Sequence, residues 1–464
     1  MKTGYFEFSV QTRVLAGLSV VLVAGCAPPI RLDIAPSLLS DQWHDIRVPA
    51  APAEVVASGW SSFGSEQLDQ MIATAQRSNP DIAIAASRIE AARADLRIAR
   101  AAGGPMIGAS GSASSDIRNL QGQTRSFDRI GSASLDVSYD VDLFGAAKAE
   151  KRATWARLRA AGYDRRAIEL AIEADVAAGY VAMAALSDRA SLADRARANA
   201  RELERIIRIR AREGVASQVE LGLQTTEGDA LEIDRSRLIE GRDRARTALA
   251  ILLGEEAPRF SPEPASLAKL VVPRIELVQP GALVTRRPDI RAAEARIDAA
   301  NGDVEAARRA FLPGLRLSAS SFFDLLGNGA ITNGGVSLSA SLFATIFDRG
   351  RLKGQLYRAS AAQHEAVALY RKALILAIAE AQDALTGSAQ SQARLDLLAR
   401  SQKEAMRTAQ LARAQYREGT ATLGTVLDAD RRLVDVDDQL VQARQESLLA
   451  AIQLFRALGG PPTG

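Results

Sequence analysis

The residue best suited to covalent chemistry is Cys26, the one cysteine in a chain of 464 residues. Residues 14–25 form a short apolar stretch behind a basic N-terminus, with the length of a signal-peptide core rather than of a membrane span. An Ala-Gly pair before the cysteine fits a signal peptidase, as in a bacterial lipobox. We therefore predict a signal peptide over residues 1–25 and a covalent lipid, such as palmitate, on Cys26.

The residue after the cysteine bears on the destination of the chain. Ala27 stands where enteric lipoproteins that stay at the inner membrane carry an aspartate, so we expect the outer membrane. An ordinary signal peptide with an incidental cysteine is the alternative interpretation.

Residues that could carry catalysis or bind a metal are otherwise sparse. Two histidines and one cysteine nearly exclude a His/Cys metal centre or a disulfide framework. His44 lies near the N-terminus, and His364 stands beside Glu365 where a solvated helical face is the simpler interpretation. The net charge of +3 is too balanced for a nucleic-acid binder. We expect that the protein is not an enzyme and that it has no metal, no nucleic-acid partner and no cofactor apart from the lipid.

Three carboxylates, Asp136, Asp140 and Asp142, alternate with apolar side chains within residues 132–142. The alternation recurs, more loosely in two cases, in residues 107–115, 315–323 and 336–344. A period of two over about ten residues is typical of transmembrane β-strands. If the apolar positions face lipid, the carboxylates face a lumen, where acidic rings either favour cations or keep the lumen wet. An amphipathic sheet on a soluble core is the alternative.

Four strands cannot close a membrane barrel, because the smallest have about eight. Open sheet edges cannot face lipid. The strands therefore require a shared barrel, with eight strands in a dimer or twelve in a trimer.

The elements that position these strands form an internal repeat. Asn79-Pro80-Asp81 matches Arg287-Pro288-Asp289 at an offset of 208 residues, and later matches keep an offset of 205. No proline occurs in residues 106–257 or 314–460, which predicts two long helices, each followed by a shorter return helix. Apolar residues at steps of three and four indicate coiled-coil packing. Gly254 and Gly459 are the predicted C-caps of the return helices.

The predicted fold class is therefore α+β with a tandem repeat. The predicted segments are a signal peptide (1–25), a lipid-anchored N-terminal segment (26–67), repeat 1 (68–254, with a β-hairpin at about 105–142), a linker (255–280), repeat 2 (281–460, with a β-hairpin at about 314–345) and a tail (461–464).

In this order the motifs resemble the TolC/OprM family of outer membrane efflux factors, lipoprotein branch. The resemblance rests on Trp60-x-x-Phe63 with Leu68 and Ile72, Asn79-Pro80-Asp81, Asp142-Leu143-Phe144-Gly145, Phe347-Asp348-Arg349-Gly350, and Tyr416-x-x-Gly419-Thr420-x-Thr422 with Val426-Leu427-Asp428.

The resemblance implies a homotrimer with a twelve-stranded outer membrane barrel and a long helical tunnel in the periplasm. Residues 255–280 would belt the tunnel. A periplasmic adaptor (membrane fusion protein) would dock at the tunnel tip and connect it to an inner-membrane pump. The implied function is a passive exit channel of a tripartite efflux pump for drugs or other small molecules. A duct for type I protein secretion and, in a different class, a lipid-anchored periplasmic coiled-coil adaptor are the alternatives.

The resemblance also assigns roles at the tip. The implied adaptor-docking residues are Gly214, Val215, Ala216, Gly419, Thr420 and Ala421. The family often has Arg where Ala421 stands and Asp where Thr425 stands, so this chain departs from the family's lock. We expect Glu220, Asp428 and Arg417 to constrict the tip instead, with Arg212 or Arg413 as alternatives to Arg417.

Overall fold

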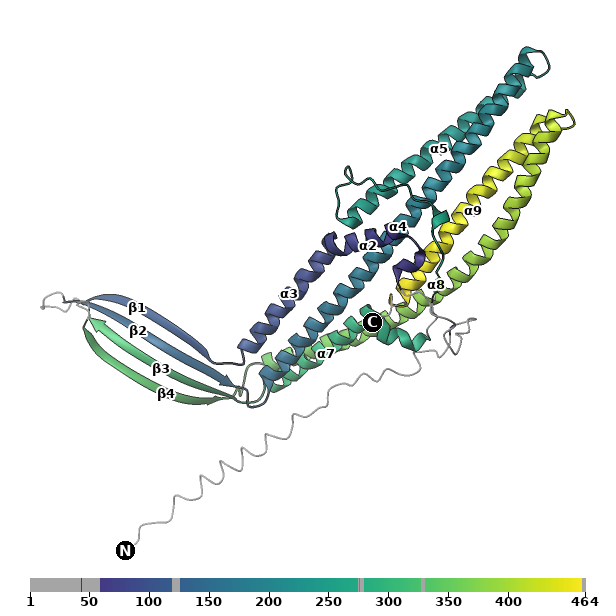
Figure 1. Ribbon diagram of the computed structural model, residues 1–464. Coiled ribbons are helices and arrows are strands. Elements are labelled where there is room, and N and C mark those ends of the chain that lie inside the picture. Colours follow the sequence, from purple (N-terminus) through teal and green to yellow (C-terminus); the bar gives the residue numbers. More distant parts are fainter. Residues whose placement is uncertain are drawn as a thin grey trace, which may run out of the picture. The chain divides into compact units, whose positions relative to one another are not determined.

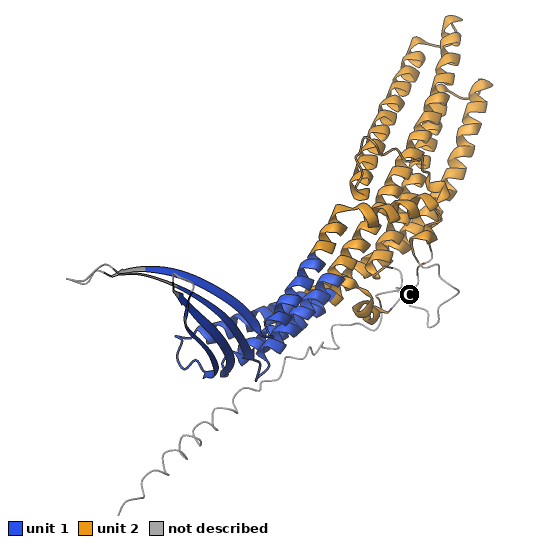
Figure 2. Ribbon diagram, turned by 60° about the vertical axis from the view of Figure 1, so that its left-hand side comes forward, with its two compact units in different colours: residues 1–34, 88–162, 292–371 blue, residues 35–87, 163–291, 372–464 orange. Residues whose placement is uncertain are grey.

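The computed structural model describes residue 43 and residues 59–118, 126–273, 275, 279–326 and 330–460. The fold is α+β, as predicted, with one antiparallel sheet and several long helices (Figure 1). The predicted signal peptide, Cys26 and His44 lie outside the described residues. The described chain divides into two compact units, one containing residues 88–162 and 292–371 and the other the remainder (Figure 2).

The sheet of the first unit joins the hairpins of the two repeats. Its strands are β1 (Met106–Arg118), β2 (Ser126–Val141), β3 (Gly314–Leu326) and β4 (Ile331–Phe343). All neighbours are antiparallel and the order is β1-β2-β3-β4, so β1 and β4 are its two edges. Each alternating segment of the sequence lies in one strand, except that Asp142 and Ala344 fall just beyond.

Four helices contribute residues to both units: α3 (Pro80–Ala101), α4 (Ala146–Arg212), α7 (Pro288–Arg309) and α8 (Arg351–Arg417). Small side chains let α4 and α7 approach closely within the first unit. A Cβ atom added to Gly302 would lie 2.8 Å from the Cβ of Ala153, so the site accepts only glycine without a shift. Arg159 pairs with Asp298 at 2.7 Å along the same contact. This packing explains how a chain poor in aromatic residues buries its helices.

The second unit holds the main apolar core. Its remaining elements are η3 (Trp60–Phe63), α2 (Glu66–Ser78), α5 (Gln218–Leu253), η4 (Leu267–Lys269), η5 (Pro280–Ala282), α6 (Leu283–Arg286) and α9 (Leu423–Ala457). Phe63 and Leu68 are fully buried, and linker residues such as Leu267 pack into the same core. The buried carboxylate of Glu173 accepts hydrogen bonds from Trp60 Nε1 at 2.8 Å and from Gln76 at 2.7 Å. Residues before the first repeat are thereby bound to α4.

The repeat is visible in how its helices end. Gly254 and Gly459 have φ of 70° and 93° and close Schellman motifs on α5 and α9. Gly254 is the C-cap of α5, as predicted, whereas the C-cap of α9 is Leu458 and Gly459 follows it. The amide of Asn79 donates to the carbonyl of Leu252 at 2.7 Å, and at the matching position of the second repeat Arg287 donates to that of Ala457 at 3.3 Å.

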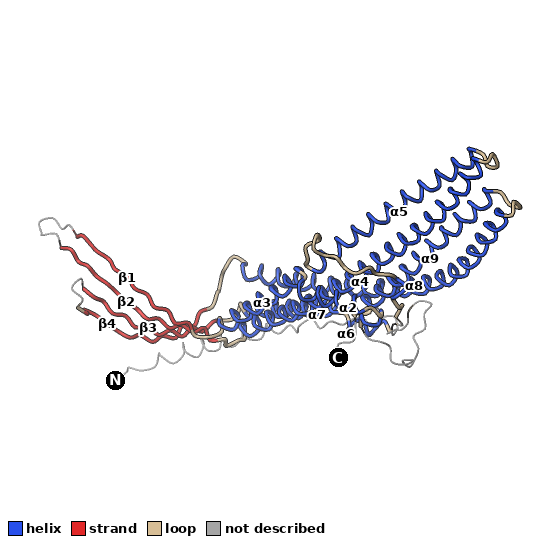
Figure 3. Tube along the Cα trace, turned by 45° about the horizontal axis from the view of Figure 1, so that its top comes forward, coloured by secondary structure: helices blue, strands red, loops and turns tan. Residues whose placement is uncertain are grey.

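The α4–α5 and α8–α9 pairs run as two helical hairpins (Figure 3). By length and composition α4 is the one described helix apolar enough to cross a membrane, but 61% of that apolar window is buried inside the protein, as in a core helix.

Candidate conduction and docking surfaces

The two faces of the sheet differ sharply in chemistry. One face of the sheet, here called the apolar face, is formed by the odd-numbered residues of β2 and β3 and the even-numbered residues of β4. It includes Leu135, Leu317, Phe323, Val336 and Leu338. These side chains are exposed, with Val336 at 78% and Leu338 at 82%. A strip of large apolar side chains that the chain itself leaves uncovered is suited to contact lipid.

The opposite face, here called the polar face, is a ladder of serine hydroxyls. Its hydrogen-bonded pairs are Ser110–Ser134 (2.9 Å), Ser112–Ser132 (2.8 Å), Ser318–Ser339 (2.8 Å) and Ser320–Ser337 (2.7 Å). In every pair the two residues stand directly opposite each other in the strand register. Directly opposed hydroxyls satisfy each other across strands. The polar face is therefore readily wetted by water, while few of its described side chains are charged.

The polar face contains two of the three predicted lumen carboxylates. Asp136 accepts a hydrogen bond from Ser134 at 2.7 Å. Asp140 forms a two-pronged ion pair with Arg316, its register partner on β3, at 2.6 and 2.9 Å. Arg316 was not among the predicted site residues, although its place in the alternating segment 315–323 assigns it to this face.

Asp142 does not belong to this face, contrary to the sequence-based expectation. Strand β2 ends at Val141, and the two carboxylate oxygens of Asp142 accept from the backbone N–H groups of Ala147 and Lys148 at 3.2 and 2.9 Å. These amides open helix α4, whose first N–H groups have no partner within the helix. Asp142 is thus a helix-capping residue, and the nearest carboxylate on the polar face is Asp140.

The corresponding corner of the second repeat uses Asp348. Its carboxylate accepts from the N–H groups of Leu352 at 2.9 Å and Gly350 at 3.0 Å, at the start of α8. The bond from Leu352 leads the causes that lower the pKa of Asp348 below its ordinary value. A carboxylate at a helix N-terminus also favours the local dipole.

The turns at the far end of each hairpin are matched Schellman motifs. Gly214 and Gly419 both have φ of 75°, a left-handed conformation that favours glycine. Val215 donates to the carbonyl of Arg210 at 2.8 Å, and Thr420 donates to that of Gln415 at 2.9 Å. The six residues assigned to docking lie in or beside these turns: Gly214, Val215, Ala216, Gly419, Thr420 and Ala421.

The three residues assigned to constriction do not meet in the described chain. Glu220 forms a capping box with Ser217, accepting from its N–H at 2.8 Å, at the start of α5. The spacing Ser-x-x-Glu already signals this role. Arg417 is exposed and donates to the carbonyl of Arg413 at 3.4 Å, while Asp428 is exposed on α9 beside Arg431.

Other side chains hold the two hairpins together near the turns. Ile207 of α4 packs in one apolar cluster with Tyr416, Leu423 and Val426 of the second hairpin. The guanidinium of Arg210 lies 5.1 Å from the centre of the Tyr416 ring.

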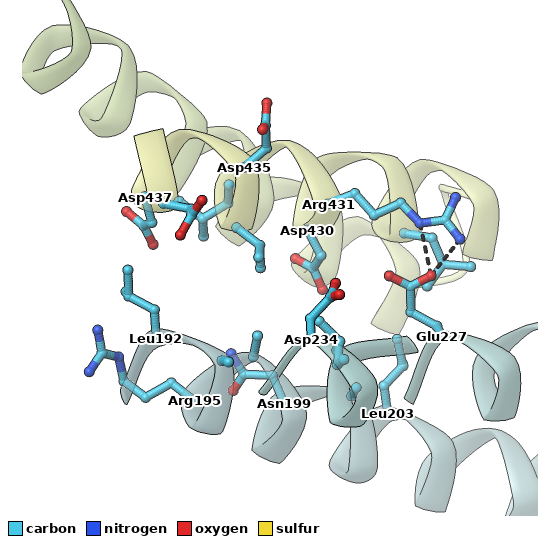
Figure 4. Close-up of a pocket in the computed structure, with 18 of the residues that line it drawn as sticks. Leu192, Arg195, Asn199, Leu203, Glu227, Asp234, Asp430, Arg431, Asp435 and Asp437 are labelled. Atoms are coloured by element: carbon cyan, nitrogen blue, oxygen red, sulfur yellow. Dashed lines mark hydrogen bonds and ion pairs between the residues drawn. The ribbon is translucent and has the colours of Figure 1, made fainter. Parts of the chain in front are cut away.

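A groove of about 610 Å³ lies between these hairpins, lined mainly by α4, α5 and α9 (Figure 4). Arg431 of α9 pairs with Glu227 of α5 at 2.5 Å, and Arg189 of α4 pairs with Asp438 of α9 at 2.6 Å. Arg413 of α8 pairs with Asp430 of α9 at 2.9 Å. Burial raises the pKa of Asp430, although the hydrogen bond from Arg413 opposes the change. Sequence reasoning missed the groove because its partners are distant in the chain.

Comparisons with known proteins agree with this geometry. The family model for outer membrane efflux proteins matches residues 71–255 and 280–460. The pyoverdine export outer membrane protein OpmQ of Pseudomonas putida is 30% identical over 465 residues, with 96% of both chains covered. The toluene efflux pump outer membrane protein TtgC of the same species is 29% identical over 475 residues, covering 97% of this chain and 96% of TtgC.

Among solved structures, the outer-membrane channel OprN superposes with a TM-score of 0.80 at 25% identity, covering 91% of this chain and 99% of OprN. The two matched ranges span both repeats and omit most of the linker between them. The chain therefore belongs to the outer membrane efflux protein family and is a transport channel component of the outer membrane.

Proposed function

We propose that this chain is the passive exit channel of a tripartite efflux pump and acts as a homotrimer. One observation carries the proposal: the sheet has an exposed apolar face, a serine-rich polar face, and two edges with one neighbour each in the described chain. Unpaired edges are not tolerated in lipid, so the sheet must be completed by further strands.

The strand order supports closure between copies. Because the four strands alternate in direction, β4 of one copy can pair antiparallel with β1 of the next. Such head-to-tail contacts close into a ring when the rotation permits. Three copies give twelve strands, with the polar face inside and the apolar face against lipid.

The hairpin turns are the proposed docking surface for a periplasmic adaptor. Their glycines allow close backbone approach, and Val215 is 69% exposed at the first turn. The groove between the hairpins extends the surface with paired charges. Glu220, Asp428 and Arg417 remain the proposed constriction residues, and Cys26 the proposed lipid attachment site.

The transported molecules are proposed to be small organic solutes. The relatives named for pyoverdine export and toluene efflux handle chemically different cargo, so the duct accepts a range of molecules. In this proposal the pump selects the solute and this chain supplies only the path.

The test measures whether the protein assembles as a trimer and which face of the sheet contacts lipid. The native mass of the detergent-extracted wild-type protein should be three times that of the lipid-modified mature chain. Leu338→Lys should abolish the trimer, since a lysine facing lipid near mid-membrane costs about 2–4 kcal/mol per chain. Its neighbour Ser339, on the polar face, provides the matched control: Ser339→Lys should assemble. A stable wild-type monomer, or equal tolerance of the two lysines, would refute the proposal.

A further inference from the structure

The described side chains of the polar face include few charges. Asp136, Asp140 and Asp324 are its carboxylates, and Arg316 is the one basic residue among the sheet side chains that the structure describes. The rest of this face is mostly serine. Each charge therefore has a large share in the potential along a path beside this face.

Arg316 is held against one particular carboxylate. Two of its nitrogens contact the two oxygens of Asp140, and its guanidinium carbon lies 5.9 Å from the centre of the Phe343 ring. A two-pronged contact fixes the plane of the guanidinium as well as its position. The pair adds no net charge at its level of the sheet.

The first repeat has no counterpart of Arg316 that could neutralise a carboxylate. The position matching Arg316 in the first repeat, 208 residues earlier, is Gly108. Gly108 stands directly opposite Asp136 across the β1–β2 pair, whereas Arg316 stands opposite Asp140 across the β2–β3 pair that joins the two repeats. A Cβ atom added to Gly108 would meet nothing within 4 Å, so the empty position reflects the sequence and not a lack of space.

We propose that Arg316 is a specificity-determining residue that limits the cation preference of the channel. It cancels the charge of Asp140, so that among the described carboxylates of this face Asp136, opposite a glycine, and Asp324 remain to attract cations. Anionic organic solutes, which three uncompensated acidic rings would repel, can then pass the serine-lined path. This inference rests on the proposed trimeric channel with its polar face inside.

The experiment measures reversal potentials of purified full-length protein in planar lipid bilayers under a KCl gradient. Arg316→Gln should raise the K⁺/Cl⁻ permeability ratio about twofold or more at 0.1 M salt, and further at 0.01 M as screening falls. Gly108→Arg should lower the ratio by a similar factor. The double variant Arg316→Gln/Asp140→Asn removes both charges of the pair and should return to the wild-type ratio.

The outcomes separate this inference from the function on which it rests. A conducting wild-type channel whose ratio is unchanged by Arg316→Gln and by Gly108→Arg overturns the role of Arg316 alone. A wild-type protein that forms no channel overturns the proposed function. If Arg316→Gln does not assemble, the exchanged pair Asp140→Arg/Arg316→Asp replaces it. A wild-type K⁺/Cl⁻ permeability ratio in the exchanged pair, together with a lowered ratio in Gly108→Arg, supports the proposal. Any other result opposes it.

Discussion

Breaking the ion pair between Arg431 and Glu227 is expected to increase leakage through the resting channel. The pair joins α9 to α5 across the groove, with side-chain exposures of 57% and 19%. Pairs this exposed contribute only about 0.2–1 kcal/mol each. If three copies separate together when the tip opens, the closed state loses about 0.6–3 kcal/mol, which shifts the closed-to-open ratio about 3- to 150-fold.

The assay is single-channel recording of the full-length protein without an adaptor. Open probability should rise in Arg431→Ala and Glu227→Ala, and the double variant should rise no further, because each single change already removes the same contact. The neighbouring Arg432 is the matched control, since it is 70% exposed and, within the part of the chain that the structure describes, pairs with Asp435 of its own helix. Additive effects of the two variants, or an equal rise in Arg432→Ala, would show that the contact between Arg431 and Glu227 does not hold the tip closed.

Three further predictions concern stability. Gly254→Ala should destabilise the fold by about 1 kcal/mol or more, since residue 254 has φ of 70° and an added Cβ would collide with the carbonyl of Ser78; Gly228→Ala, in open space within α5, should be neutral or stabilising in the same thermal-unfolding scan. Glu173→Ala should lower the free energy of unfolding by about 2–3 kcal/mol, because it leaves the Trp60 N–H buried without its acceptor, and it should change the tryptophan fluorescence. Glu173→Gln, which keeps an acceptor oxygen, should retain part of the stability. Because the folded pKa of Asp348 is lowered, its stabilisation of the α8 N-terminus should be complete above about pH 4 and lost as the pH falls through the lowered pKa. The protection factor of the Leu352 amide, which corrects the exchange rate for its intrinsic pH dependence, should follow that loss in the wild type and show no such change in Asp348→Ala.

The helices and strands of this fold can be predicted from the sequence because short local patterns determine them. Period-two alternation marks the strands, and the glycines after the return helices mark their ends, since a left-handed residue is needed there. The capping role of Glu220 was also readable from its spacing to Ser217. Local patterns thus predicted the strands, the long helices and the glycines at the ends of the return helices, whereas the capping roles of Asp142, Glu220 and Asp348 were not predicted.

The pairings that define the sites are not local. Asp140 and Arg316 are 176 residues apart and meet only through the β2–β3 register, and Arg431 and Glu227 are 204 residues apart. Asp142 kept the parity of the strand but lies beyond its last residue, where free helix amides capture its carboxylate. A pattern that assigns a face does not show where the strand stops.

The serine pairs of the polar face have one further consequence, for the physics of the wall itself. In the pairs Ser112–Ser132, Ser318–Ser339 and Ser320–Ser337 either hydroxyl can be the donor, so the dipole of the pair has no fixed direction. Ser134 donates its hydrogen to Asp136 and therefore accepts from Ser110. Hydroxyl groups reorient far faster than a solute crosses a membrane. The wall therefore responds as a soft dielectric, turning its dipoles toward whichever charge is passing. Such a wall responds to either sign of charge but supplies no free energy, so the direction of net transport has to be imposed from outside this part of the chain.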